Sequence, residues 1–133
     1  MSWILLVLLA GPVQAEDHSV VVTDDVKVQP INKKSIRRLF TGQEGQWEDG
    51  RPVNLILPPM DSEAMSWLSA QVLGLPPDIY HRYLLEKAYR AGRAPPQIAG
   101  SIDDLLELAE GSDLVLTVLP LPVGDGFQVV QIN

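Results

Sequence analysis

Apolar positions along the 133-residue chain change their spacing from segment to segment, and each spacing predicts an element. The β-branched run at residues 20–23 indicates a first strand, and the apolar run at 52–58 indicates a second. Ile36, Leu39 and Phe40 recur at the spacing of one helix face. Further helices are predicted at 61–74, 78–89 and 101–111, and further strands at 114–120 and 127–132.

This order of elements predicts an α/β fold with at least one parallel crossover. The apolar fraction of 46% and the charged fraction of 20% are ordinary for a globular protein. The sequence has no internal repeat and no low-complexity linker. We therefore expect one domain, which is the usual number for a chain of this length.

The net charge of −7 opposes binding to nucleic acid and to anionic lipid, so no nucleic-acid partner is expected. The chain has no cysteine, which excludes disulfides, thiolate metal sites and thiol nucleophiles.

Residues 1–15 have the composition of a signal peptide. An apolar core at 3–10 is followed by a Gly-Pro pair and by Val13 and Ala15, the residue pattern that signal peptidase needs. A buried strand and a membrane anchor are the structural alternatives, but an anchor needs about 20 apolar residues. We expect cleavage after Ala15, a mature domain at 16–133, and a periplasmic or secreted location.

No catalytic constellation is visible. His18 lies in a segment expected to be mobile, and His81 lies on a predicted helix with no motif around it. The carboxylate pairs Asp24-Asp25 and Asp103-Asp104 stand in turn or cap positions, where such residues usually serve helix termini and solvation. We expect no enzyme, no catalytic residue, no cofactor and no metal.

Basic residues gather on two of the predicted helices. They are Lys33, Lys34, Arg37 and Arg38 on the first, and Arg82, Lys87, Arg90 and Arg93 on or just after the third. One interpretation is a docking patch for a membrane surface or an acidic partner. The other is the solvated face opposite the apolar side chains, and that interpretation is preferred.

Three runs, at residues 35–53, 71–96 and 101–111, carry a succession of motifs. A helix ends in Phe-x-Gly, and a Trp-x-Asp-Gly segment and a strand follow. Later, a helix ending in Val-Leu-Gly precedes a Tyr-rich helix, a Gly/Arg loop with proline and a serine-capped helix. The residues are Phe40, Gly42, Trp47, Asp49, Gly50, Val72, Leu73, Gly74, Tyr80, Tyr83, Tyr89, Gly92, Pro95, Pro96 and Ser101. In this order they resemble the phosphate-binding protein of the ABC phosphate importer.

Full members of that family have two α/β lobes that close on the anion, and this chain is long enough for one. The resemblance implies a single lobe of a type 2 periplasmic-binding-protein-like fold, with a mixed, mostly parallel sheet flanked by helices. Phe40 and Trp47 would be buried together, clamping the helix-to-strand connection. Gly42 and the Asp49-Gly50 turn would supply backbone conformations that bulky residues resist.

The resemblance also implies a site. In the family, a Ser-Gly-Thr segment at a helix N-terminus holds phosphate through N–H groups and hydroxyls. The corresponding place here is 58–67, and Asp61, Ser62 and Glu63 are the candidate ligand-binding residues. Ser62 keeps a hydroxyl, whereas the two carboxylates suit the helix dipole but would repel a dianion.

Two functions follow from these observations. The first is a solute-binding module for phosphate or another small anion, associated with ABC-type phosphate uptake and with a membrane transporter or envelope protein as partner. The second is an interaction or structural protein that kept the lobe and lost the anion site. The family resemblance favours the first, and the acidic residues beside Ser62 favour the second.

Overall fold

The computed structural model describes residues 17–27 and 30–133, so the expected leader lies outside the described part of the chain. All the predicted helices and strands are present. The elements are β1 (His18–Thr23), α2 (Lys33–Thr41), β2 (Asn54–Leu57), α3 (Glu63–Leu68), the π-helical turn η1 (Ser69–Leu73), α4 (Pro77–Ala91), β3 (Gln97–Ile98), α5 (Ile102–Glu110), β4 (Val115–Pro120) and β5 (Phe127–Val129). The sequence pattern did not predict β3 or the change from α-helix to π-helix at Ser69.

The five strands form one mixed sheet in the order β3-β2-β4-β1-β5. β2 runs parallel to both β3 and β4, whereas β1 runs antiparallel to both β4 and β5. Four strands therefore share one direction and β1 alone opposes them. This confirms the predicted α/β fold with a mixed, mostly parallel sheet and a parallel crossover.

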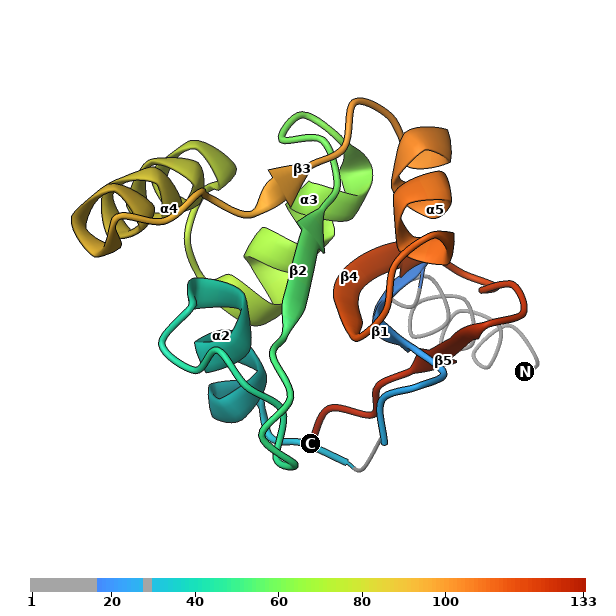
Figure 1. Ribbon diagram of the computed structural model, residues 1–133. Coiled ribbons are helices and arrows are strands. Elements are labelled where there is room, and N and C mark those ends of the chain that lie inside the picture. The colour runs from blue at the N-terminus through green and yellow to red at the C-terminus, as the bar shows by residue number, and fades with distance from the viewer. Residues whose placement is uncertain (1–16, 28–29) are drawn as a thin grey trace, which may run out of the picture.

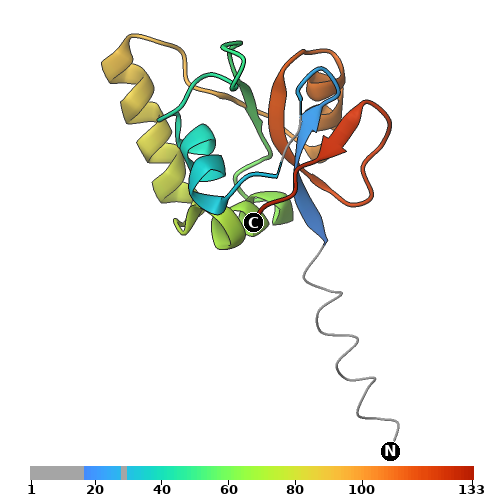
Figure 2. The same cartoon turned by 90° about the horizontal axis from the view of Figure 1, so that it is seen from below.

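Helices cover both faces of this sheet (Figures 1 and 2). On one face Val20, Val22 and Leu116 belong to a core cluster that also takes in buried side chains of α2, α3, η1 and α4. On the other face Val21 and Leu119 join a smaller cluster with buried side chains of α5. Neighbouring residues of one strand point to opposite faces, so β1 and β4 are apolar throughout.

The ends of α2 and α4 meet at a buried hydrogen bond. Phe40 and Tyr80 are both fully buried, and the Tyr80 hydroxyl donates to the backbone carbonyl of Phe40 at 2.6 Å. Burial raises the pKa of the Tyr80 phenol. Gly42 ends α2 at a φ of 77°, a left-handed conformation that confirms the expectation from the sequence.

Replacing Phe40 with alanine should lower the free energy of unfolding by about 3–5 kcal/mol, because the change empties the centre of the larger core. Denaturant unfolding measures the loss. Tyr89→Ala is the matched control, since that aromatic side chain is 88% exposed and should contribute little. A loss below about 1 kcal/mol for Phe40→Ala would mean that this core does not depend on Phe40.

Candidate functional site

The Trp47–Arg51 segment forms a closed turn. The Trp47 amide donates to the Arg51 carbonyl at 2.8 Å, and the Gly50 amide donates back to the Trp47 carbonyl at 2.9 Å. Gly50 has a φ of 89°, as its glycine identity led us to expect. The Asp49 carboxylate accepts from the Arg51 amide at 3.1 Å and from its Nε at 2.8 Å. Asp49 and Gly50 therefore have a structural role.

A second set of contacts ties this turn to the start of β4. Leu114 has a positive φ of 59°, which is unusual for a residue with a bulky side chain. Its amide donates to both carboxylate oxygens of Asp25, at 3.0 and 3.2 Å. Its carbonyl accepts from the Trp47 indole Nε1 at 3.3 Å and from the Asn54 amide at 3.0 Å. Strands β1, β2 and β4 thus meet at Leu114.

Trp47 corrects one expectation. Phe40 is fully buried, but Trp47 is only half-buried and packs at the margin of the core. The reason is its indole N–H, which must stay in reach of the Leu114 carbonyl and so holds the ring at the edge of the sheet. Trp47 thus links its turn to the residue that precedes β4, and it does not cover Phe40 in the core.

Asp25 and His18 carry roles that the sequence did not reveal. The sequence predicts only a turn and solvation role for Asp25. In the structure its carboxylate accepts hydrogen bonds from the Leu114 amide and from the Thr23 hydroxyl. That hydrogen bond, followed by the one from the Leu114 amide, lowers the pKa of the Asp25 carboxyl despite the opposing effect of desolvation. His18 was placed in a mobile segment, but it begins β1, pairs with Pro120 and is 9% exposed.

The candidate anion site lies where the parallel strands end. The carboxyl ends of β2 and β3 point to the same edge of the sheet, and the loops that lead to α3 and α5 lie together at the top of Figure 1. In open α/β sheets this edge is where ligands bind. At this edge the structure places Asp61 in the loop from β2 to α3, Ser62 as the N-cap of α3 and Glu63 as its first residue.

The Ser62 hydroxyl is already committed to the fold. It accepts from the Met65 amide at 3.2 Å as the N-cap of α3, and it donates to the Pro59 carbonyl at 2.6 Å. The Ser66 amide makes the first intrahelical bond to the Ser62 carbonyl. The amides of Glu63 and Ala64 precede that bond and have no intrahelical partner, and Ala64 itself is buried.

The N-terminus of α5 is closed in a similar way. The Ser101 hydroxyl accepts from the Asp104 amide at 3.0 Å, which confirms Ser101 as the cap. The Asp104 carboxylate accepts from the Gly100 amide at 2.9 Å. A carboxylate of the chain itself therefore takes a backbone donor that an incoming anion would need.

Charge at this edge is negative. Asp61 and Glu63 are exposed, and no ion pair within the described residues involves either. The sequence has no Lys or Arg between residues 52 and 81, and none after Arg93. An oxyanion at α3 would meet two carboxylates with no cation of the neighbouring loops to offset them.

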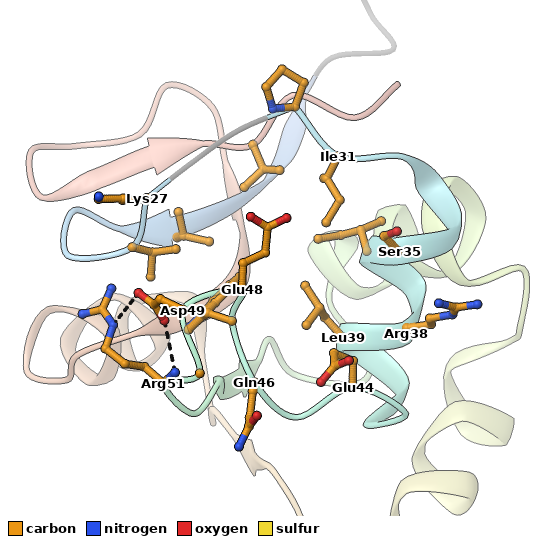
Figure 3. Close-up of a pocket in the computed structure, with 17 residues that line it drawn as sticks. Lys27, Ile31, Ser35, Arg38, Leu39, Glu44, Gln46, Glu48, Asp49 and Arg51 are labelled. Atoms are coloured by element: carbon orange, nitrogen blue, oxygen red, sulfur yellow. Dashed lines mark hydrogen bonds and ion pairs between the residues drawn. The ribbon is translucent and has the colours of Figure 1, made fainter.

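A groove of the described residues lies at the opposite end of the sheet. This groove of about 690 Å³ is bounded by α2, the Trp47–Arg51 turn and the end of β1 (Figure 3). Its lining is apolar at Val22, Ile36 and Val130, with Lys27, Arg38, Glu44 and Glu48 among its charged residues. Cations and anions are mixed there, so the groove has no preference for an anion, and its size alone does not make it the site.

The described residues contain no group of three or more His, Asp or Glu side chains placed to hold a metal ion. No helix among them is long and apolar enough to span a bilayer.

No protein-family model matches the sequence, and no curated protein resembles it closely enough to count as a relative. The fold, however, matches that of solved phosphate-transport proteins. A structure from Clostridium perfringens, described as a phosphate ABC transporter substrate-binding protein with bound phosphate, aligns over 87% of this chain with a TM-score of 0.56 and 12% identity. An ABC-type phosphate transport receptor from Vibrio cholerae aligns over 87% with a TM-score of 0.63 and 9% identity. PstS from Borrelia burgdorferi aligns over 93% with a TM-score of 0.60 and 10% identity.

This chain covers 44%, 46% and 53% of those three proteins, so it spans about half of their length. The match is to one lobe, as the sequence motifs led us to expect. Identities near 10% establish the fold alone.

Replacing Asp25 with asparagine should destabilise the protein by about 1 kcal/mol at pH 7, because the charged acceptor of the Leu114 amide is lost. The folded-state pKa of Asp25 is lowered, so its contribution is present above the ordinary carboxyl value and is lost as the pH falls through the lowered folded value. Denaturant unfolding between pH 7 and pH 3 should show the two proteins converging in acid. Asp24→Asn, at the neighbouring exposed carboxyl, is the control; equal losses for both variants at every pH would contradict the role of Asp25.

Proposed function

We propose that this chain is a non-enzymatic solute-binding lobe for phosphate or a related small oxyanion, associated with ABC-type phosphate uptake. The observation that carries the proposal is the structural match to one lobe of three phosphate-transport proteins, one of them with bound phosphate. The carboxyl edge of the parallel strands supports it, because this is the usual ligand edge of such sheets. Fold similarity is an associational argument, so the site has to be tested directly.

The proposed anion site is the start of α3, with Asp61, Ser62 and Glu63 around it. The amides of Glu63 and Ala64 would supply the hydrogen bonds, and the helix dipole would add a partial positive charge. Ser62 would orient these amides as the cap of the helix, because its own hydroxyl is committed to Pro59 and Met65.

Affinity at this site is set by the two carboxylates. A like charge at about 4 Å costs on the order of 1–4 kcal/mol between the dielectric of water and that of a protein surface. Such a cost is comparable to the whole binding energy of a weak site. We expect phosphate to bind with a Kd of about 1 mM or weaker, equivalent to about −4 kcal/mol.

We also propose that the mature domain begins at Glu16 and works in the periplasm or outside the cell, with a transporter or envelope protein as its partner. The composition of residues 1–15 supports export. N-terminal sequencing of the protein exported from a Gram-negative host should read Glu16 first. A soluble product that retains Met1 would contradict export.

A second candidate function is an interaction or structural protein that kept the lobe without its ligand. The full use of the Ser62 hydroxyl and the Asp104–Gly100 contact favour it, since the chain satisfies its own donors at the ligand edge. The two functions differ in one measurable property, which is binding of an oxyanion at α3.

Calorimetric titration with phosphate separates the two functions. The unaltered protein should bind at about 1 mM or weaker, and replacing Asp61 with Gly and Glu63 with Thr should tighten binding about tenfold or more by removing like charge. A control variant, Asp24→Asn with Glu48→Gln, removes the same charge at the far end of the sheet and should change little. Micromolar binding by the unaltered protein would refute the charge argument. No gain in the α3 variant, with its fold intact by thermal unfolding, would mean that α3 is not the site.

A further inference from the structure

The two faces of the molecule carry opposite charge. Eight of the ten Lys and Arg residues lie in α2, in α4 or at Arg93, on one side of the sheet. α5 covers the other side, and every charged residue within it is acidic. A chain with a net charge of −7 thus has one basic helical layer and one acidic helix.

α4 has a solvent face that is unusual for a small domain. Only Tyr80 and Leu84 are buried in this 15-residue helix. Of the four exposed large apolar side chains in the described chain, three lie on α4: Ile79 at 38%, Leu85 at 44% and Tyr89 at 88%. An exposed Tyr beside Arg is a composition typical of the centre of protein interfaces.

The basic residues of this face are Arg82 and Arg90, both exposed. Arg90 makes only a loose, exposed ion pair with Glu86, at 3.8 Å. Lys87 is different, because its side chain contacts the protein itself. It lies over Gly42 at the C-terminal end of α2, where the helix dipole favours a cation, and its ammonium group lies over the Tyr83 ring. The outer face of α4 is thus Arg82, Leu85, Glu86, Tyr89 and Arg90, with two cations and one carboxylate.

The exposed face of α5 complements this arrangement. Asp103, Glu107 and Glu110 are exposed and lie one helical turn apart, so they form a single acidic stripe. At 1.5 Å per residue the stripe is about 10.5 Å long, and the two arginines of α4 are about 12 Å apart. Half-buried Leu106 borders the stripe and could contact an apolar neighbour.

We propose that the outer face of α4 is a docking surface for the acidic stripe of α5 on a second copy of this chain. Arg82 and Arg90 would pair with the stripe, while Leu85 and Tyr89 would be covered at its border. A membrane surface fits less well, because the net charge of −7 opposes anionic lipid. The contact does not involve Ser62, so it stands or falls independently of anion binding.

The geometry also fixes the kind of assembly. α4 and α5 lie on opposite sides of the sheet (Figure 1), so the two contacting surfaces of each copy are different. Such a contact is heterologous, so it builds a ring if the rotation between copies closes and an open chain if it does not. The expected product is a head-to-tail assembly of copies, a ring or a chain, that grows with concentration, rather than a closed two-fold dimer.

Sedimentation velocity of the purified protein tests the proposal. At low salt the mean sedimentation coefficient should rise with concentration, and the association constant should fall about tenfold or more in 0.3 M salt, because exposed charges are then screened. Tyr89→Ala should weaken association without any change of charge. A protein that stays monomeric at millimolar concentration and low salt would overturn the proposal. Binding of such a monomer to vesicles of anionic lipid would identify the membrane as the partner instead.

Charge reversal identifies the surfaces. Arg82→Glu with Arg90→Glu should abolish self-association, and so should Glu107→Arg with Glu110→Arg. An equimolar mixture of the two variants should associate again, because each reversed surface then finds its opposite. Lys33→Glu with Lys34→Glu on α2 is the matched control and should leave association unchanged. Loss of association in this control, or no association in the mixture, would refute the pairing of α4 with α5.

Discussion

The carboxylate of Asp25 holds the backbone of Leu114 in a left-handed conformation, and three parts of the structure depend on this contact. The Leu114 carbonyl, turned by that conformation, receives the Trp47 indole and the amide that begins β2. The next amide, that of Val115, donates to the Thr23 hydroxyl at 3.0 Å and starts β4 beside β1. A short polar cluster therefore fixes where the central strands begin, and strand register decides which side chains reach each core.

At the opposite end of the sheet, too, side chains of the protein accept hydrogen bonds from its own backbone amides. There the parallel strands bring two helix N-termini together, which is a favourable arrangement for an anion. Ser62 and Ser101 cap these helices, and the Asp104 carboxylate takes a further backbone donor. The fold resembles one lobe of phosphate-transport proteins, while side chains of this chain accept from the amides of Met65, Gly100 and Asp104 at this end of the sheet. The anion site proposed at α3 would therefore bind only weakly.

Local features of the fold were predictable because local interactions cause them. Gly42 and Gly50 have the left-handed conformations that glycine allows, and Ser101 caps the helix that follows it. The two-residue strand β3 was not predictable, since two residues carry no periodicity and pair only because β2 is beside them. The burial of His18 likewise depends on its partner Pro120, which is about a hundred residues away in the sequence.

The candidate site shows the same division. The position of Ser62 at a helix N-terminus could be predicted, because the cap pattern lies within a few residues. The commitment of its hydroxyl to Pro59 could not be predicted, and neither could the role of Asp25, whose partner Leu114 is distant in sequence. Pattern reasoning finds groups that could bind a ligand, whereas only the folded chain shows which of them are still free.

The anion site that we propose lies at the start of α3 and is weakened by the carboxylates of Asp61 and Glu63. Amide NMR spectra recorded during a phosphate titration test it most directly, because each N–H group reports separately. The amide signals of Glu63 and Ala64 should shift together and saturate only at millimolar phosphate, while those of the groove around Trp47 should not change. Shifts confined to that groove, or none at α3 at any concentration, would contradict the proposal.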